Sequence, residues 1–208
     1  MNTLLSIGII QSALFIGLNL NKKRKQSQDW LLITWLGLFA LHLGLILLLY
    51  LKVQLVFPLI LAKVFILIHG PMLFVYTDAV FRQKIDVRHW IHLLPFGVAL
   101  MISSLIGSGL VSTRFLWEYE VGLLVLKLLS FWVYPWLVWA KINRALQRLG
   151  MEYSTDFAAK VSWIKIVGWL IFGSGVLGVV FLVLSSFFKQ EVYAVLDIMV
   201  YVMVIILM

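Results

Sequence analysis

Residues 43–51 read LGLILLLYL, without a charged side chain, inside an apolar run that extends from Trp30 to Leu51. A helix needs about 20 apolar residues to cross a bilayer, whereas strands of a membrane barrel alternate apolar and polar side chains. The continuous run therefore favours a transmembrane helix.

Runs of similar length recur along the whole chain. The 208 residues are 63% apolar and only 12% charged, whereas soluble domains are roughly 45–50% apolar and 25% charged. This composition excludes a soluble enzyme, and the lack of cysteine excludes a disulfide-rich secreted chain. We predict an all-α, polytopic membrane helix bundle over 1–208, with seven transmembrane helices at Thr3–Leu20, Trp30–Leu51, Leu55–Phe81, Trp90–Val111, Val121–Ile142, Trp163–Phe188 and Val192–Met208.

The net charge of +8 is unevenly distributed between the two sides of this predicted bundle. Twelve basic residues fall on one side, namely Lys22, Lys23, Arg24, Lys25, Arg82, Lys84, Arg88, Lys141, Arg144, Arg148, Lys160 and Lys165. Three fall on the other side, Lys52, Arg114 and Lys189. Since basic loops stay in the cytoplasm, the N-terminus is expected outside. These loops are expected to lie against anionic lipid headgroups of the bilayer and to bind no nucleic acid.

Four ionisable residues inside the predicted spans are candidates for ligand binding. Lys63, Lys127, Asp197 and His42 lie about 12, 9, 8 and 14 Å below the outer surface at 1.5 Å per residue. Groups at one level suggest a pocket open to the outside, with Asp197 beside one lysine and the other lysine available to a small anionic ligand. The alternative is snorkelling of the lysines toward the headgroups, plus one structural Lys–Asp pair.

Other motifs give little indication of chemistry. Asp86, His89 and His92 are spaced three apart, which permits a metal cluster but more simply indicates interfacial polar residues. The sequence contains no H-E-x-x-H, G-x-S-x-G or Walker motif, and the last span lacks a lysine for retinal. We therefore expect no catalytic residue, no metal and no cofactor.

Prolines and small residues within the spans predict how the helices bend and pack. Proline removes a helical hydrogen bond and is expected to kink its span at Pro58, Pro71, Pro95 and Pro135. Small residues four apart allow close packing of helices, at Gly8/Ser12, Ala13/Gly17, Ser103/Gly107 and Ser174/Gly178. Packing within the bundle is the simpler interpretation, and a homodimer is the alternative.

The segment His69–Tyr76 reads HGPMLFVY, and after several basic residues the chain reads HLLPF at 92–96. This resembles the G-P-L-L-Y-x-Y … H-F-x-P-F pattern in the membrane half of bacterial AraC-type transcription regulators. Gln11 and Phe15 before a basic loop are similar too, whereas Asp78 departs from the family, which more often has a basic or neutral polar residue there.

The resemblance implies a signal-sensing domain in the bacterial cytoplasmic membrane. DNA binding would belong to a cytoplasmic helix-turn-helix domain that is not among these residues. Because the last run covers only about 25 Å of a roughly 30 Å core, we expect further apolar residues and a basic flank beyond Met208. The alternatives are a small seven-span transporter, which would show two similar halves, and a membrane enzyme acting on lipids.

Overall fold

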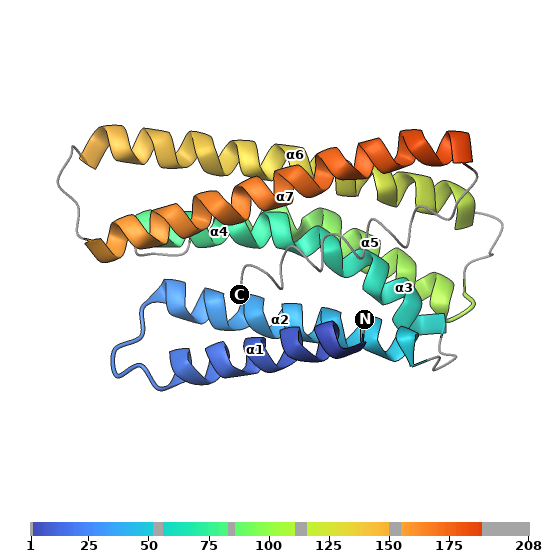
Figure 1. Cartoon of the computed structure of the whole chain (residues 1–208), viewed down its shortest axis with the longest axis horizontal. Helices are drawn as coiled ribbons and strands as arrows, with labels where there is room; N and C mark the ends of the chain where they lie inside the picture. The colour runs from blue at the N-terminus through green and yellow to red at the C-terminus, as the bar shows by residue number, and fades with distance from the viewer. Residues whose placement is uncertain (1, 52–55, 83–85, 111–115, 150–154, 189–208) are drawn as a thin grey trace.

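The computed structural model describes residues 2–51, 56–82, 86–110, 116–149 and 155–188, and every regular element in them is a helix (Figure 1). The elements in chain order are α1 (Asn2–Leu20), α2 (Ser27–Tyr50), α3 (Val56–Phe65), the 3-10 helix η1 (Ile66–Ile68), α4 (His69–Arg82), the 3-10 helix η2 (Val87–Leu93), α5 (Leu94–Gly107), α6 (Leu116–Leu149) and α7 (Thr155–Phe188). The all-α prediction is confirmed for these residues.

Among the residues that the structure describes, six helical segments are long and apolar enough to cross a membrane. They correspond to the first six predicted spans, and the seventh, Val192–Met208, lies outside the described residues. The largest differences are at the ends, because α6 and α7 extend into charged sequence that the apolar criterion left out. Charged residues such as Lys and Arg are good helix formers, so a helix continues past the apolar region that defines its span.

The predicted third span is one helical segment with a break near its centre. Pro71 has no N–H, and its ring crowds the carbonyl four residues earlier, at Leu67. Just before this proline the chain tightens into η1, and α3 is inclined to α4 (Figure 1). Pro58 and Pro95 lie in the first turns of α3 and α5, where a missing N–H costs little, and Pro135 lies inside α6 without a change of helix type.

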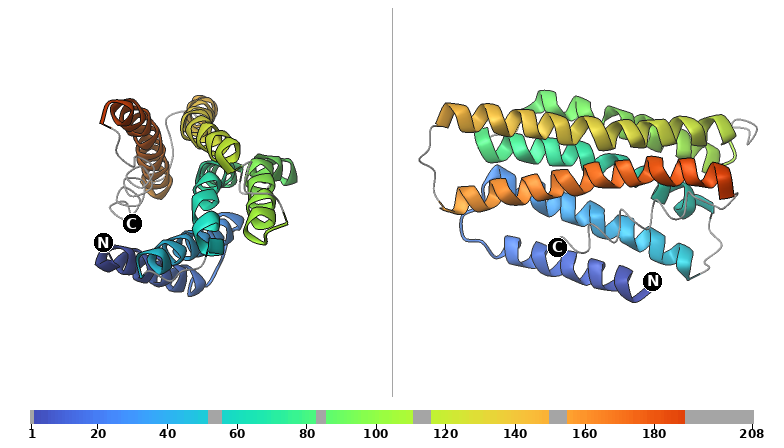
Figure 2. Two further views of the ribbon diagram at one scale, coloured as in Figure 1. Left: turned by 90° about the vertical axis from the view of Figure 1, so that its right-hand side faces the viewer. Right: turned by 45° about the horizontal axis from the view of Figure 1, so that its top comes forward.

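Helix α4 lies at the centre of the described bundle. In the 18-residue apolar window of Leu61–Arg82, 94% of the residues are buried, whereas the corresponding windows of the other described spans have 17–39% of their residues buried. Helix α4 contacts α2, α6, α7 and η2, and the end-on view in Figure 2 shows it between the other helices. Its apolar residues, among them Met72 and Leu73, form part of the largest hydrophobic cluster. Polar side chains on this helix therefore need partners within the protein.

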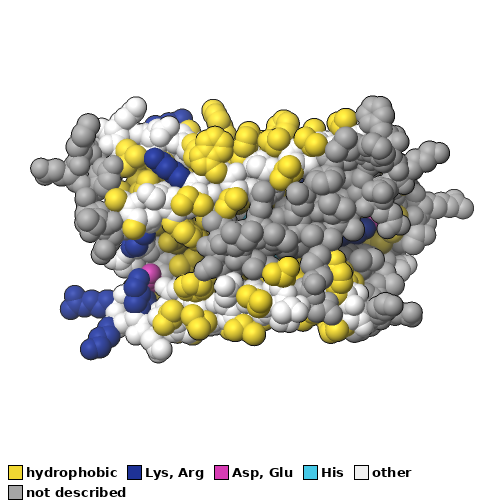
Figure 3. All heavy atoms as spheres, viewed as in Figure 1, with side chains coloured by type: hydrophobic (Ala, Val, Ile, Leu, Met, Phe, Trp, Pro, Cys, Tyr) yellow, Lys and Arg dark blue, Asp and Glu magenta, His cyan; other side chains and the backbone are white. Residues whose placement is uncertain are grey.

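Basic side chains gather at one end of the bundle. Figure 3 shows most of the visible Lys and Arg at the end where α1 leads into α2 and α6 leads into α7. The connection between α1 and α2 carries the run 22–25, and Arg82 ends α4. We call this the basic end; Lys52, Arg114 and Lys189, predicted for the opposite side, lie outside the described residues.

The backbone of α4 lies against side chains of α6 at Gly70. A Cβ atom built there would lie 2.7 Å from Cδ2 of Tyr134 and 2.8 Å from Oγ of Ser130. Both distances are shorter than van der Waals contact. Helix α4 can therefore reach this position against α6 only with glycine at residue 70.

We predict that Gly70→Ala destabilises the bundle. The added methyl group forces α4 away from α6, and overpacking of this kind costs about 1–3 kcal/mol. Unfolding of the purified protein in detergent measures the loss. The matched control is Gly44→Ala on α2, where the new methyl meets open space and alanine is the better helix former. Equal losses for the two variants would show that the contact at Gly70 is unimportant.

Candidate functional site

A chain of hydrogen bonds crosses the interior of the bundle from α2 to the break before α4. The indole Nε1 of Trp35 lies 3.1 Å from Nδ1 of His69, and Nε2 of His69 lies 3.1 Å from Nδ1 of His42. Nε2 of His42 then lies 2.9 Å from the carbonyl oxygen of Ala62 in α3. All four residues are buried.

The chemistry of the two ends fixes the direction of this chain. An indole N–H can only donate, so His69 accepts at Nδ1 and carries its proton on Nε2. His42 then accepts at Nδ1 and donates from Nε2 to the Ala62 carbonyl, which can only accept. Each imidazole is therefore in one defined neutral tautomer, and every nitrogen and oxygen atom in this series of hydrogen bonds has a partner. We call these four groups the imidazole chain.

Removing the first donor tests the imidazole chain. Trp35→Phe leaves Nδ1 of His69 buried without a donor, which we expect to lower the free energy of unfolding by about 1–2 kcal/mol. Trp30→Phe is the matched control, because Trp30 is on the same helix and 52% exposed.

The Trp35→Phe cost should shrink in a His69→Leu background, since the acceptor is then already gone. The cost of Trp35→Phe in each background is measured from unfolding curves of the purified proteins. Full additivity of the two changes would argue against the hydrogen bond.

A second polar cluster surrounds Asp78, near the basic end of α4. The Asp78 side chain is 2% exposed, and its Oδ1 lies 2.6 Å from Nζ of Lys141 on α6 and 3.0 Å from Nε of Arg82. Lys141 also lies over the ring of Phe74, 4.0 Å from its centroid. One buried carboxylate thus joins α4 to α6, since an unpaired charge here would be costly.

Helix η2 reaches the same carboxylate from its other side. Nδ1 of His89 lies 3.1 Å from Oδ2 of Asp78, but the two atoms are not aligned as a hydrogen bond, and both are buried. His89 stacks with His92, and both rings pack edge-on against Phe74. We call Asp78, Lys141, Arg82 and His89 the Asp78 cluster.

Asp86 does not join the two histidines that follow it. Its carboxylate accepts a hydrogen bond from the Arg88 backbone N–H at 3.0 Å and caps η2, and this bond lowers the pKa of Asp86. Within the described parts of the chain, no group of three or more His, Cys, Asp or Glu residues could hold a metal ion. The even spacing of Asp86, His89 and His92 thus reflects a cap followed by two stacked rings.

Effects of different size are expected for substitutions of the two aspartates. Asp78→Asn leaves Lys141 without its buried carboxylate, a loss of about 3–5 kcal/mol in free energy of unfolding. The double variant Asp78→Asn, Lys141→Met should recover part of it, because the unpaired charge of the largely buried Lys141 is removed and Arg82 is exposed to solvent. Asp86→Asn, on an exposed side chain, should change little. The free energies of unfolding of the three variants are measured in detergent. A double variant less stable than Asp78→Asn alone would contradict the pairing of Asp78 with Lys141.

The residues predicted to line the outer pocket have different partners in the structure. Nζ of Lys63 lies 2.6 Å from Oε1 of Glu120, at the start of α6. His42 belongs to the imidazole chain, so both its ring nitrogens contact protein groups. Lys127 is near enough to His42 to interact with it electrostatically. Asp197 lies outside the described residues, so its pairing with a lysine stays a prediction.

Several of these partners were not predicted from the sequence. Glu120 falls just before the predicted fifth span, and Trp35 reads as an ordinary apolar residue. Asp78 stood out as a departure from the AraC-type pattern, but nothing in the sequence joined it to Lys141. The available signal was charge, because Asp78 is an acidic residue inside an apolar span.

Comparison with known proteins adds no relative. No family model matches the chain, and no curated protein or solved structure matches it.

Proposed function

We propose that this chain is the signal-sensing membrane domain of an AraC-type transcription regulator in a bacterial cytoplasmic membrane. The resemblance of residues 69–96 to that family supports this function, as do six helices able to cross a membrane. In this proposal the chain senses a signal outside the cell or in the membrane. A cytoplasmic helix-turn-helix domain beyond these residues gives the output.

The observation that carries the proposal is the pair of polar attachments on the central helix. His69, at the start of α4, is tied to α2 through the imidazole chain. Asp78, nine residues or about 14 Å further along, is tied to α6 and η2. Buried ionisable groups within a membrane are costly and usually have a function.

This arrangement suits transmission of a signal along one helix. A sensor needs an element with two arrangements that differ in their contacts. A shift of α4 that changes the contacts of His69 also changes the distance of Asp78 from Lys141 and His89. A signal that changes the contacts at one end of α4 then changes the arrangement of charges in the Asp78 cluster, near the basic end.

Seven spans with the N-terminus outside complete the proposal, with the basic end in the cytoplasm. Reporter fusions test this orientation. A fusion after Lys25 should report the cytoplasm, and a fusion after Glu118 should report the outside. Fusions that report the reverse would invert the whole arrangement.

Transcript levels test the proposed function. Deletion of the gene should change the levels of a limited set of transcripts, and the full-length wild-type gene should restore them. The double variant Asp78→Asn, Lys141→Met should reach the membrane but fail to restore transcription, because the polar attachment of α4 is gone. Gly44→Ala is the control that should restore it fully.

The transporter alternative gives a different result. Deletion would then abolish uptake of a labelled solute, the purified protein would restore that uptake in vesicles, and transcript levels would not change.

A further inference from the structure

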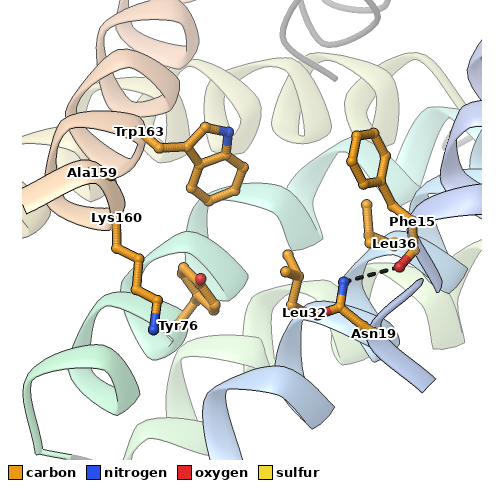
Figure 4. Close-up of a pocket in the computed structure, with 8 residues that line it drawn as sticks. All are labelled: Phe15, Asn19, Leu32, Leu36, Tyr76, Ala159, Lys160 and Trp163. Carbon is orange, nitrogen blue, oxygen red and sulfur yellow. Dashed lines mark hydrogen bonds between the residues drawn. The ribbon is translucent and has the colours of Figure 1, made fainter. Parts of the chain in front are cut away.

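A cavity separates the α1–α2 hairpin from the first half of α7. Its volume is about 340 Å³, and it is lined by Phe15 and Asn19 of α1, Leu32 and Leu36 of α2, Tyr76 of α4, and Ala159, Lys160 and Trp163 of α7 (Figure 4). This volume is at the lower end of the range for small-molecule sites. We call it the hairpin cavity.

The walls of the hairpin cavity are mostly apolar. Phe15, Leu36 and Trp163 surround its middle, and Figure 4 shows the Trp163 ring on the side opposite Leu32. Water in such a cavity would find few hydrogen-bond partners, so the cavity favours an apolar occupant.

Polar atoms are confined to a few positions on the wall. The Lys160 side chain extends toward Tyr76, whose hydroxyl group is on the cavity side of the ring (Figure 4). The amide of Asn19 donates to the Phe15 carbonyl at 2.9 Å, so its orientation is fixed.

Lys160 brings a positive charge to this apolar space. Asp29 interacts with Lys160 electrostatically but forms its ion pair with Lys22 at 2.7 Å. Among the carboxylates whose side chains the structure describes, none lies within ion-pair distance of Lys160. An anionic group at the cavity would complement this charge.

From this combination we infer that the hairpin cavity binds a single-chain anionic amphiphile, with a carboxylate head and an unbranched apolar tail. The head lies at Lys160, near the basic end, and the tail lies between Phe15, Leu36 and Trp163. A phospholipid with two acyl chains does not fit, because the cavity has room for one chain. Such a ligand reaches the site from the bilayer, where it is already concentrated.

Photolabelling of the purified full chain in detergent tests this inference. The probe is tetradecanoic acid carrying a diazirine in its tail, and labelled peptides are mapped by mass spectrometry. Label is expected on α1, α2 and α7 at the cavity residues. Unlabelled tetradecanoic acid should compete, whereas tetradecanol and phosphatidylglycerol should compete at least tenfold more weakly.

Variants separate the roles of charge and space. Lys160→Gln should reduce labelling about tenfold, since a charge-assisted hydrogen bond is lost, and Lys160→Arg should retain it. Ala159→Trp keeps the charge but fills the cavity, and it should also abolish labelling. Lys165→Gln, on the same helix but away from the cavity lining, is the matched control and should label like the wild type.

Three results would overturn the inference. They are label spread evenly over the lipid-facing helices, tetradecanol competing as well as the acid, and no label at the cavity residues because another part of the chain fills the space. Binding is measured on the purified protein, so the result does not depend on whether the chain regulates transcription.

Discussion

Burial of α4 on every side is the constraint on which the rest of the structure depends. A helix at the edge of a membrane bundle can direct a polar side chain toward headgroups or water. On a helix surrounded by other helices, a polar side chain reaches neither, so each donor and acceptor on it needs a protein partner. Thr77 meets this need locally, with its hydroxyl donating to the Leu73 carbonyl at 2.7 Å. His69 meets it through other helices, and Asp78 meets it through Lys141 on α6 as well as through Arg82 on its own helix.

These two longer attachments explain how the helices around α4 are held. Membrane helices gain little from the hydrophobic effect among themselves, because lipid is as apolar as the protein. Close packing, as at Gly70 against Tyr134, and buried hydrogen bonds therefore provide most of the specificity. Between α6 and α5 the same principle recurs, where Tyr119 donates to the Ala99 carbonyl at 3.1 Å and also contacts Ser103.

The positions of the spans could be predicted from the sequence, but the partners of their polar residues could not. Length and hydropathy identify a span because the bilayer imposes both on the chain. Partner choice depends on how far each helix is rotated about its axis, and apolar residues on all sides of α2 and α7 conceal that rotation. Lys63 illustrates the difference, since its position inside a span was predictable, whereas its partner Glu120 falls outside the predicted spans. Pro71 signalled a bend, yet the 3-10 turn before it depends on local packing.

The lengths of α6 and α7 have a mechanical consequence. Each has 34 residues and is therefore about 51 Å long, well beyond a hydrocarbon core of roughly 30 Å. A pair of helices this long can fit the bilayer by tilting, and the angle follows the local thickness of the membrane. Lys141 is on one of these helices, so a change in the tilt of α6 would move Lys141 relative to Asp78. A bilayer of different thickness would thereby act on a buried ion pair without any molecule being bound.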